Sequence, residues 1–233
     1  LSAGPESLDD FILIKSDGYP TYNFAHIIDD LLMGVTHITR ADEFISSTPK
    51  FLALYDALGI KENPTEEEIA AGMHARPQIA SLPPIMSPDG KKKLGKRDGA
   101  KDILDYRAEG YLPEAMLNFL AFIGWNPGDE REIMSATEIM EAFDFAKVQS
   151  AGGKLNEEKL MWTNREYLVR MDNPEWLKRF FAWLESPYPY AEDTRRALED
   201  RGIRVDGEMF ADILTNVCRE RISYFGEIKA MID

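Results

Sequence analysis

The chain has 233 residues, and its 41 acidic side chains against 27 basic ones leave a formal net charge of −14. This acidity argues against a protein that coats nucleic acid without selectivity. A single cysteine, Cys218, excludes an internal disulfide framework and a cysteine-based zinc site. No apolar run approaches the ~20 residues of a membrane span, and the three scattered histidines suggest no metal site. We therefore expect one large or two modest domains, with no membrane contact and no bound metal of its own. The single cysteine fits a cytoplasmic protein, and a secreted protein without disulfides is the alternative.

The first sixty residues predict alternating strands and helices. Residues 10–15 are typical of a short buried strand, and residues 22–33 of a helix that ends before a glycine. Residues 35–40 are β-branched and alternate, which predicts the next strand. Thr48 is expected to cap a further helix that has proline at its first position. This order predicts an α/β region with a parallel sheet.

Strand signals almost vanish after these elements. Thr65 and Glu68 form a capping-box pattern, and residues 76–90, rich in proline and serine, predict a loop. Caps and glycines then predict only helices, over residues 102–109, 113–123, 157–162 and 175–185, after a cap at Ser135, and over 207–232. We expect an α/β region over residues 1–98 and a helical region with a boundary near residue 172.

A cationic run occupies residues 91–97, where five lysines and arginines accompany Leu94 and Gly95. From residue 89 to residue 101 six cations face two anions, a local charge of +4 in an acidic chain. Two interpretations compete at this stage. The run is either solvated surface, where lysines are commonly found, or a binding loop for a polyanion such as phosphate.

Arg40 follows the second predicted strand, at the edge where open α/β sheets hold their ligands. A guanidinium there can bind a carboxylate through two parallel hydrogen bonds. A surface ion pair is the commoner role for any single arginine.

Six sequence blocks, taken in order, resemble one family. They are Asp-Gly-Tyr-Pro-Thr-Tyr-Asn-Phe-Ala (17–25), Asp-Asp-x-x-Met-Gly-Val-Thr-His (29–37), Arg-Ala-Asp-Glu-Phe (40–44), Lys-Leu-Gly-Lys-Arg (93–97), Glu-Gly-Tyr-Leu-Pro-Glu-Ala (109–115) and Lys-Leu-Met-Trp-Thr-Asn-Arg-Glu-Tyr (159–167). The chain resembles bacterial-type glutamyl-tRNA synthetases, which are class I aminoacyl-tRNA synthetases. The resemblance implies the second half of a Rossmann-like catalytic domain (1–98), a helical stem-contact domain (99–171) and part of a helical anticodon-binding domain (172–233).

The resemblance assigns the cationic run to the phosphates of ATP. It implies that Lys93 and Lys96 are the catalytic charges and that Leu94, Gly95 and Arg97 complete the loop. Gly95 stands where the family usually has serine, which removes a hydroxyl and makes the backbone more flexible. Ile85 and Met86 match the position whose backbone reads adenine, with one residue of alignment slack.

The resemblance also implies a glutamate site. Arg40 resembles the arginine that pairs with a substrate carboxylate, Tyr22 the tyrosine beside it, and His26 a variable wall position for which a neutral spacer competes with a direct contact. Glu43 and Phe44 match residues beside the ribose and adenine of ATP, although ordinary core packing competes for Phe44. Asp30 matches a residue near the acceptor end of tRNA; capping or structural ion pairing is an equal alternative.

The activity implied by this resemblance is ATP-dependent attachment of glutamate to tRNA(Glu), with Mg²⁺ accompanying ATP and the protein acting as a monomer. The His-x-Gly-His signature of class I synthetases does not occur in this sequence. We therefore expect a fragment that carries half of the active site and is inactive alone. A free-standing tRNA-binding or regulatory module is the alternative, and a glutaminyl enzyme is less favoured because its blocks differ. The sequence leaves open whether tRNA(Gln) is also charged.

Overall fold

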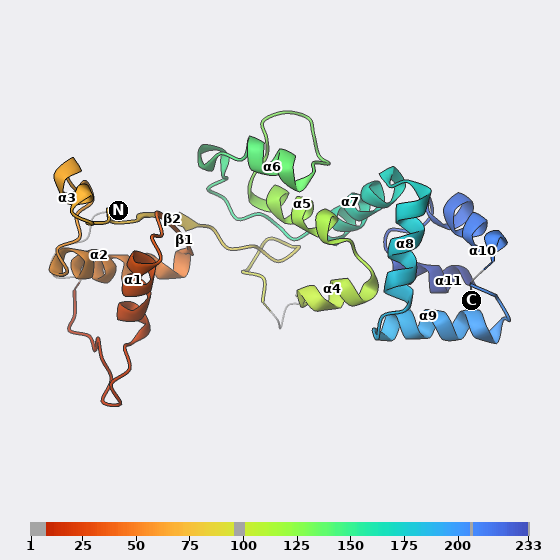
Figure 1. The fold of residues 1–233 in the computed structure, drawn as a ribbon, viewed down its shortest axis with the longest axis horizontal. Coiled ribbons are helices and arrows are strands. Elements are labelled where there is room, and N and C mark those ends of the chain that lie inside the picture. Colours follow the sequence, from red (N-terminus) through yellow and green to blue (C-terminus); the bar gives the residue numbers. More distant parts are fainter. Residues whose placement is uncertain (1–7, 96–100, 206, 233) are drawn as a thin grey trace. The chain divides into compact units, whose positions relative to one another are not determined.

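The computed structural model describes residues 8–95, 101–205 and 207–232 (Figure 1). The chain divides into two compact units, Leu1–Pro84 and Ile85–Asp233. Among the described residues, no helix has both the length and the apolar character needed to cross a membrane.

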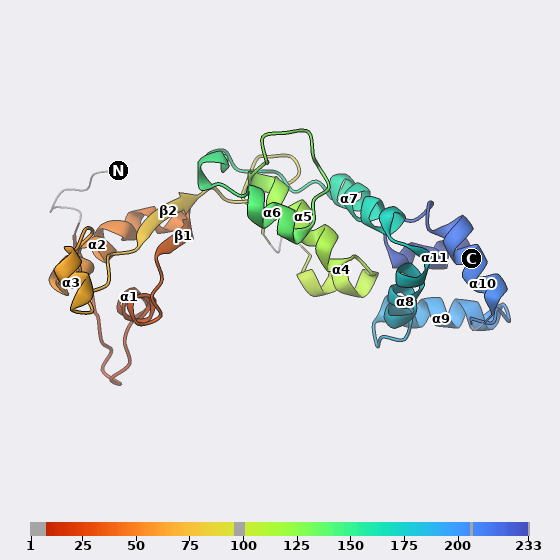
Figure 2. The same cartoon turned by 45° about the horizontal axis from the view of Figure 1, so that its top comes forward.

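The first unit is built on a two-stranded parallel sheet. Strand β1 (His37–Ala41) pairs with β2 (Gln78–Leu82) so that His37 lies opposite Gln78 and Ala41 opposite Leu82, and Figure 2 shows the two strands side by side. Helices α1 (Tyr22–Leu32), α2 (Thr48–Ala57) and α3 (Glu66–Ala70) and the 3₁₀ segment η2 (Asp42–Ser47) complete the unit. Its core contains Ile27, Phe51, Leu54 and Tyr55, with Phe11 and Leu13 packed against them.

The predicted strand over residues 10–15 is wrong. The structure shows only one isolated bridge there, between Ile14 and Pro20, and Ile12 and Ile14 are 68% and 58% exposed. The side chains of this segment nevertheless alternate between core and solvent, because Phe11 and Leu13 contact the core while Ile12 and Ile14 are exposed. A period of two needs a partner strand to form a ladder, and no strand of the described residues pairs with this segment.

Two further local predictions are wrong. Residues 76–90 were expected to be a loop, yet they contain β2, which pairs with a strand distant in sequence and so leaves little local signal. Thr48 was expected to cap α2, but it is the first helical residue, and its hydroxyl donates to the carbonyl oxygen of Phe44 at 3.1 Å. In contrast, the capping box of Thr65 and Glu68 is confirmed, with both reciprocal hydrogen bonds present.

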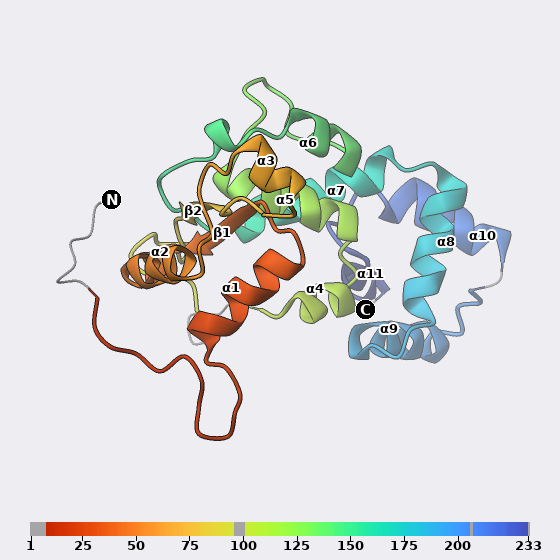
Figure 3. The same cartoon turned by 60° about the vertical axis from the view of Figure 1, so that its left-hand side comes forward.

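The second unit contains helices joined by short loops, and Figure 3 shows them from another side. They are α4 (Ile103–Glu109), α5 (Pro113–Gly124), α6 (Ala136–Ala142), α7 (Glu157–Arg170), α8 (Asn173–Leu184), α9 (Pro189–Asp200), α10 (Glu208–Ile213) and α11 (Ile228–Ile232), with short turns η4 (Phe145–Lys147), η5 (Leu214–Cys218) and η6 (Phe225–Glu227). The predicted cap at Ser135 is confirmed as a full capping box. Helical prediction succeeded here because caps and glycines act locally.

The aromatic residues of α8 form the main core of the second unit. Trp176 and Phe180 are fully buried and stack at 5.5 Å, and the ring of Phe225 meets both edge-on. Leu112 and Leu168, which precede residue 172, belong to the same cluster. Helices on both sides of the predicted boundary at residue 172 therefore share one core.

The long helix predicted over residues 207–232 is wrong. The chain there forms α10, the π-helical turn η5, the 3₁₀ turn η6 and α11. Phe225, 2% exposed, packs into the aromatic core between these pieces, and the backbone amide of Ser223 donates to the carboxylate of Glu227. Burial of Phe225 against Trp176 outweighs the helical preference of the segment.

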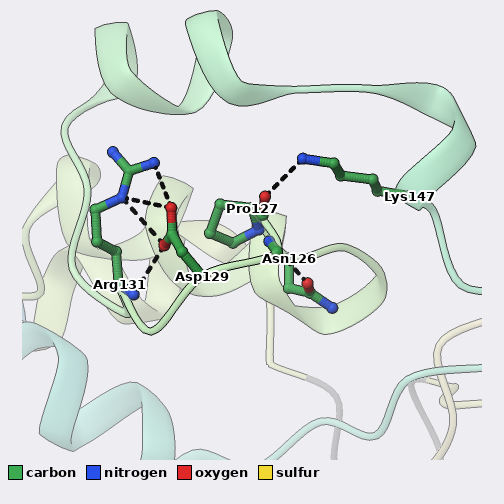
Figure 4. A network of polar contacts seen from close by, with 6 residues as sticks. Asn126, Pro127, Asp129, Arg131 and Lys147 are labelled. Atoms are coloured by element: carbon green, nitrogen blue, oxygen red, sulfur yellow. Dashed lines mark hydrogen bonds and ion pairs between the residues drawn. The ribbon is translucent and has the colours of Figure 1, made fainter.

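The loop that joins α5 and α6 is held by polar contacts (Figure 4). Arg131 binds both carboxylate oxygens of Asp129, with distances of 2.8 to 3.1 Å, and the ammonium of Lys147 donates to the carbonyl oxygen of Pro127 at 2.6 Å. The Asp129 pKa is lowered because Arg131 donates to it. Local side-chain contacts thus shape this loop without a sheet.

Candidate active site residues in the two units

Arg40 lies in β1, next to its last residue, and pairs in register with Ser81 of β2. Its guanidinium carbon lies 5.5 Å from the ring centroid of Tyr22, 5.1 Å from that of Phe44 and 5.2 Å from that of Phe51. One guanidinium N–H donates to the Tyr22 hydroxyl. Three aromatic rings therefore attract and hold a cation whose remaining donors can bind an anion.

His26 lies one helical turn after Tyr22 and joins the same aromatic group. Its ring stacks on Tyr22 at 5.1 Å and meets Phe51 edge-on at 4.5 Å. The imidazole Nδ1 lies 2.8 Å from the carbonyl oxygen of Tyr22, which can only accept, so Nδ1 carries the proton. Burial lowers the His26 pKa below 6.5, and nearby Arg40 lowers it further, whereas the Tyr22 carbonyl and Asp30 oppose the shift. A neutral His26 supports the spacer interpretation.

A hollow of about 420 Å³ opens beside this cation. It is lined by Tyr22, Asp30, Val35, His37, Ile38, Thr39, Arg40, Ala41 and Phe44. A cation, a phenol and an aliphatic wall around a small volume suit a compact anion with a short chain. Asp30 is half-buried at the hollow, whereas Glu43 is exposed and His26 lies behind Tyr22 rather than at the lining.

The structure places Tyr22, His26 and Arg40 side by side, as the glutamate assignment expects. It adds Phe44, which was assigned to ATP, and Phe51, which was not predicted. The buried side chains of α2 are Phe51, Leu54 and Tyr55. Phe51 is 1% exposed and contacts both Arg40 and His26. An aromatic residue one turn after Thr48 was the available signal, although its partner lies on a strand that precedes the helix.

The cationic run of the second unit begins in a tight hairpin. Met86 pairs with Lys93 in an antiparallel bridge, the Ser87 amide donates to the Lys92 carbonyl at 2.8 Å, and the Leu94 amide donates to the Ile85 carbonyl at 2.8 Å. The left-handed φ of +72° at Gly90 completes the turn. The three lysines of residues 91–93 are therefore presented from an ordered backbone.

The turn of this hairpin is stabilised by two side chains. Ser87 is buried, at 4% exposure. Its hydroxyl donates to the Asp89 carboxylate at 2.6 Å, and the same carboxylate accepts from the Lys91 amide at 3.1 Å. These two hydrogen bonds lower the Asp89 pKa, and the one from Ser87 has the larger effect. The Asp89 carboxylate is thus engaged in hydrogen bonds of the turn, and the three lysines of residues 91–93 are exposed.

A third segment pairs with the hairpin from the other side. The Met86 amide donates to the Gly153 carbonyl at 2.9 Å, and the Leu155 amide donates to the Met86 carbonyl at 3.2 Å. Met86 therefore pairs with Lys154 in a parallel bridge as well as with Lys93. Ile85 and Met86 are the two candidates for backbone recognition of adenine. The Met86 N–H already donates to Gly153, whereas the Ile85 N–H has no hydrogen-bond partner among the described residues.

Leu94 and Gly95 are half-buried at the end of the hairpin, while Lys96 and Arg97 lie outside the described residues. No group of three or more histidine, cysteine, aspartate or glutamate side chains that could hold a metal ion occurs in the part of the chain described.

Comparison with known proteins places these features in a family. Residues 2–162 match the model described as "tRNA synthetases class I (E and Q), catalytic domain". A glutamate–tRNA ligase of Clostridium botulinum (strain Hall) is 36% identical over 98% of this chain and 42% of its own length, and glutamate–tRNA ligase 1 of Aliarcobacter butzleri is 42% identical over 78% and 36%. The chain thus spans less than half the length of these curated relatives.

Solved structures agree with these matches. The crystal structure of a glutamate tRNA ligase from Elizabethkingia meningosepticum in complex with its amino acid superposes with a TM-score of 0.75 at 34% identity, over 97% of this chain and 43% of that one. A glutamate-tRNA synthetase from Elizabethkingia anophelis gives the same TM-score and coverage. This chain belongs to the class I tRNA synthetases for glutamate and glutamine and has their catalytic-domain fold, with a small parallel sheet and a helical continuation.

Proposed function

We propose that this chain supplies the glutamate pocket and part of the ATP site of a ligase that attaches glutamate to tRNA. The observation that carries the proposal is the Arg40 guanidinium, held by three rings and the Tyr22 hydroxyl at the edge of a hollow. A charged amino acid needs such a fixed, partly desolvated cation to bind selectively. The named relatives act on glutamate, which agrees with this chemistry.

The proposed reaction has two balanced steps. A carboxylate oxygen of glutamate attacks the α-phosphorus of ATP, the bond to the bridging oxygen breaks, and pyrophosphate leaves. The terminal ribose hydroxyl of tRNA then attacks the activated carbonyl, and AMP leaves. Arg40 holds a glutamate carboxylate with Tyr22 beside it. Lys93 and Lys96 stabilise the charge that grows on the phosphate oxygens, an effect that is largest in the transition state.

The remaining roles of the ATP site follow from the hairpin and from η2. Adenine recognition by the backbone is assigned to Ile85 rather than Met86, because Gly153 already accepts the Met86 N–H. Phe44 offers one face of its ring beside Arg40, and Glu43, exposed in the same 3₁₀ segment, supplies an acceptor for a ribose hydroxyl. Leu94, Gly95 and Arg97 complete the phosphate loop.

Partners follow from the same proposal. Mg²⁺ enters bound to the triphosphate of ATP, as a part of the substrate. Residues 99–171 contact the stem of tRNA(Glu) and residues 172–233 belong to the anticodon-binding region, while Asp30 lies near the acceptor end. The ligase acts as a monomer in the cytoplasm, where charged tRNA is used.

Pyrophosphate exchange tests this function. The polypeptide encoded by the reading frame that contains this chain is incubated with ATP, labelled pyrophosphate, glutamate and tRNA(Glu), and the label entering ATP is counted. We expect exchange with glutamate and at least a hundredfold less with glutamine or aspartate, because Arg40 and Tyr22 define one acidic side-chain length. Exchange that depends on glutamine instead would overturn the assignment of the pocket.

A further inference from the structure

The hairpin that carries Lys93 receives a further lysine from a distant part of the chain. Lys154 lies sixty-one positions after Lys93 in the sequence, in the segment between η4 and α7, and it pairs with Met86 in a parallel bridge. Met86 is therefore bridged on both sides, to Lys93 by an antiparallel bridge and to Lys154 by a parallel one. Residues paired across neighbouring strands direct their side chains to the same face.

The Lys154 side chain extends along the hairpin as far as its turn. A Cβ atom placed on Gly90 would lie 2.4 Å from the Lys154 Cε and 2.8 Å from its Nζ, so the lysine occupies the space that any other residue at position 90 would fill. Gly90 thus has two roles: it adopts the left-handed φ of +72° that the turn needs, and its missing side chain leaves the space, here called the seat, that Lys154 occupies. The Lys154 ammonium group consequently lies at the hairpin turn, beside Gly90.

Several lysine side chains lie near this seat. Within the described residues the Lys154 ammonium makes no ion pair, although Lys91, Lys92 and Lys93 are close in sequence to its seat. The single nearby acidic side chain of the turn, Asp89, is already engaged by the Ser87 hydroxyl and the Lys91 amide. A fourth ammonium, brought from a distant segment, strengthens the attraction of this hairpin for a polyanion.

We propose that Lys154 is a second phosphate-binding lysine of this hairpin, sharing a face with Lys93. The ligand chemistry is phosphate, supplied either by the triphosphate of a nucleotide or by the backbone of an RNA. The proposal rests on the proposed function, since Lys93 is there the phosphate-binding partner. It adds a residue from outside the cationic run and from the segment that leads into α7.

Binding measurements on the 233-residue chain test this assignment, with two probes. Tripolyphosphate and ATP are titrated in one arm and a tRNA transcript in the other, each at two salt concentrations. Lys154→Gln is expected to weaken binding about fivefold in the arm that supplies the phosphate, and Lys154→Arg less than twofold, because arginine keeps the charge. Lys15→Gln, which removes an exposed lysine of the first unit with the same charge change, is expected to leave both arms unchanged.

A double-mutant cycle separates the seat from general disturbance of the turn. Gly90→Ala strains the left-handed turn in any background, but it displaces an ammonium only when Lys154 is present. We expect Gly90→Ala to weaken phosphate binding several times more in the wild-type chain than in the Lys154→Gln chain. Equal effects in the two backgrounds would remove the seat from the proposal.

The outcomes separate this inference from the function on which it rests. If Lys93→Gln weakens binding and Lys154→Gln leaves both arms unchanged, with both variants melting as the wild type does, Lys154 has no phosphate role and the ligase proposal stands. If the wild-type chain binds neither probe, the phosphate role of the hairpin fails together with that of Lys154. Weakening by Lys154→Gln in either arm supports the inference and names the source of the phosphate.

Discussion

The Arg40 pocket and the lysine hairpin hold their cations in different ways. Arg40 is half-buried among three rings and donates to Tyr22, so its position is set by side-chain packing. Lys91 and Lys93 are exposed, and the backbone beneath them is fixed through the bridges of Met86. A planar guanidinium with a fixed orientation suits selection of one small carboxylate, whereas exposed ammonium groups suit a phosphate chain that changes its charge during the reaction.

The largest effect is expected from Arg40→Ala. Removing a partly desolvated guanidinium leaves the bound carboxylate without its partner, which weakens glutamate binding about a hundredfold. ATP binding should weaken far less, because Arg40 supports the Phe44 ring of the proposed ATP site but carries none of its phosphate-binding charges. Calorimetric titration of glutamate and of ATP measures both. Arg40→Lys is expected to recover little, because an ammonium cannot make two parallel hydrogen bonds.

Arg196→Ala is the control for this variant, since it removes an exposed arginine of α9. It should leave both titrations unchanged. Equal losses of glutamate and ATP binding in Arg40→Ala would show that Arg40 supports the fold of its unit rather than the ligand.

A second comparison concerns stability, and Gly110→Ala addresses it. Gly110 has φ of +95°, and an added Cβ would lie 2.7 Å from the Phe225 Cβ and 3.1 Å from two atoms of the Trp183 ring. Strain and overpacking together should destabilise the second unit by about 3 kcal/mol. Urea unfolding followed by tryptophan fluorescence reports this unit, because Trp176 and Trp183 are buried in it.

Gly34→Ala is the matched control in the first unit. Gly34 also has a left-handed φ, +68°, but nothing lies within 4 Å of an added Cβ. It should cost only the backbone strain, about 1 kcal/mol. Equal costs for the two variants would mean that the aromatic core around Phe225 can yield to the extra methyl group.

Lys93→Ala should produce a smaller effect than Arg40→Ala. An exposed ammonium contributes less to ligand binding than a walled guanidinium, so ATP should bind about tenfold more weakly, with glutamate binding unchanged. In the polypeptide encoded by the reading frame that contains this chain, Lys93→Ala and Lys96→Ala should lower the rate of pyrophosphate exchange more than they lower ATP affinity. The two lysines act on the charge that grows on the phosphate oxygens in the transition state. Lowered affinity with an unchanged rate constant would make Lys93 a ground-state contact only.

Short motifs singled out residues that the structure places together, whereas periodicity located the strands less well. Tyr22, Arg40 and Phe44 come from three different elements, and tertiary packing brings their side chains into contact. Phe51 was missed, since its contact with Arg40 depends on how α2 packs beside β1. The roles of these residues stay predictions.

Errors in the fold have a common physical cause. The strand β2 and the broken helix near Phe225 depend on partners distant in sequence, namely β1 and Trp176. Caps, by contrast, involve residues three positions apart, and those of Thr65 and Ser135 were predicted correctly. Lysine patterns were informative about charge, but nothing in the local sequence indicated that Lys154 lies on Gly90.

The smallest effect is a pH dependence that distinguishes the packed pocket from exposed surface. His26 has its pKa lowered below 6.5, chiefly by burial, so the folded chain resists protonation of this ring. The unfolded chain binds the proton first as pH falls below 6.5, and stability is therefore lost from that point downward. His26→Gln should flatten this loss between pH 7 and 5 in urea unfolding of the first unit, whereas His74→Gln, which removes an exposed histidine of the same unit, should leave the curve as it is. Because a neutral His26 serves as a wall behind Tyr22, glutamate affinity should stay constant from pH 8 to 7; a rise in affinity as His26 becomes protonated would instead make the ring a direct contact of the bound carboxylate.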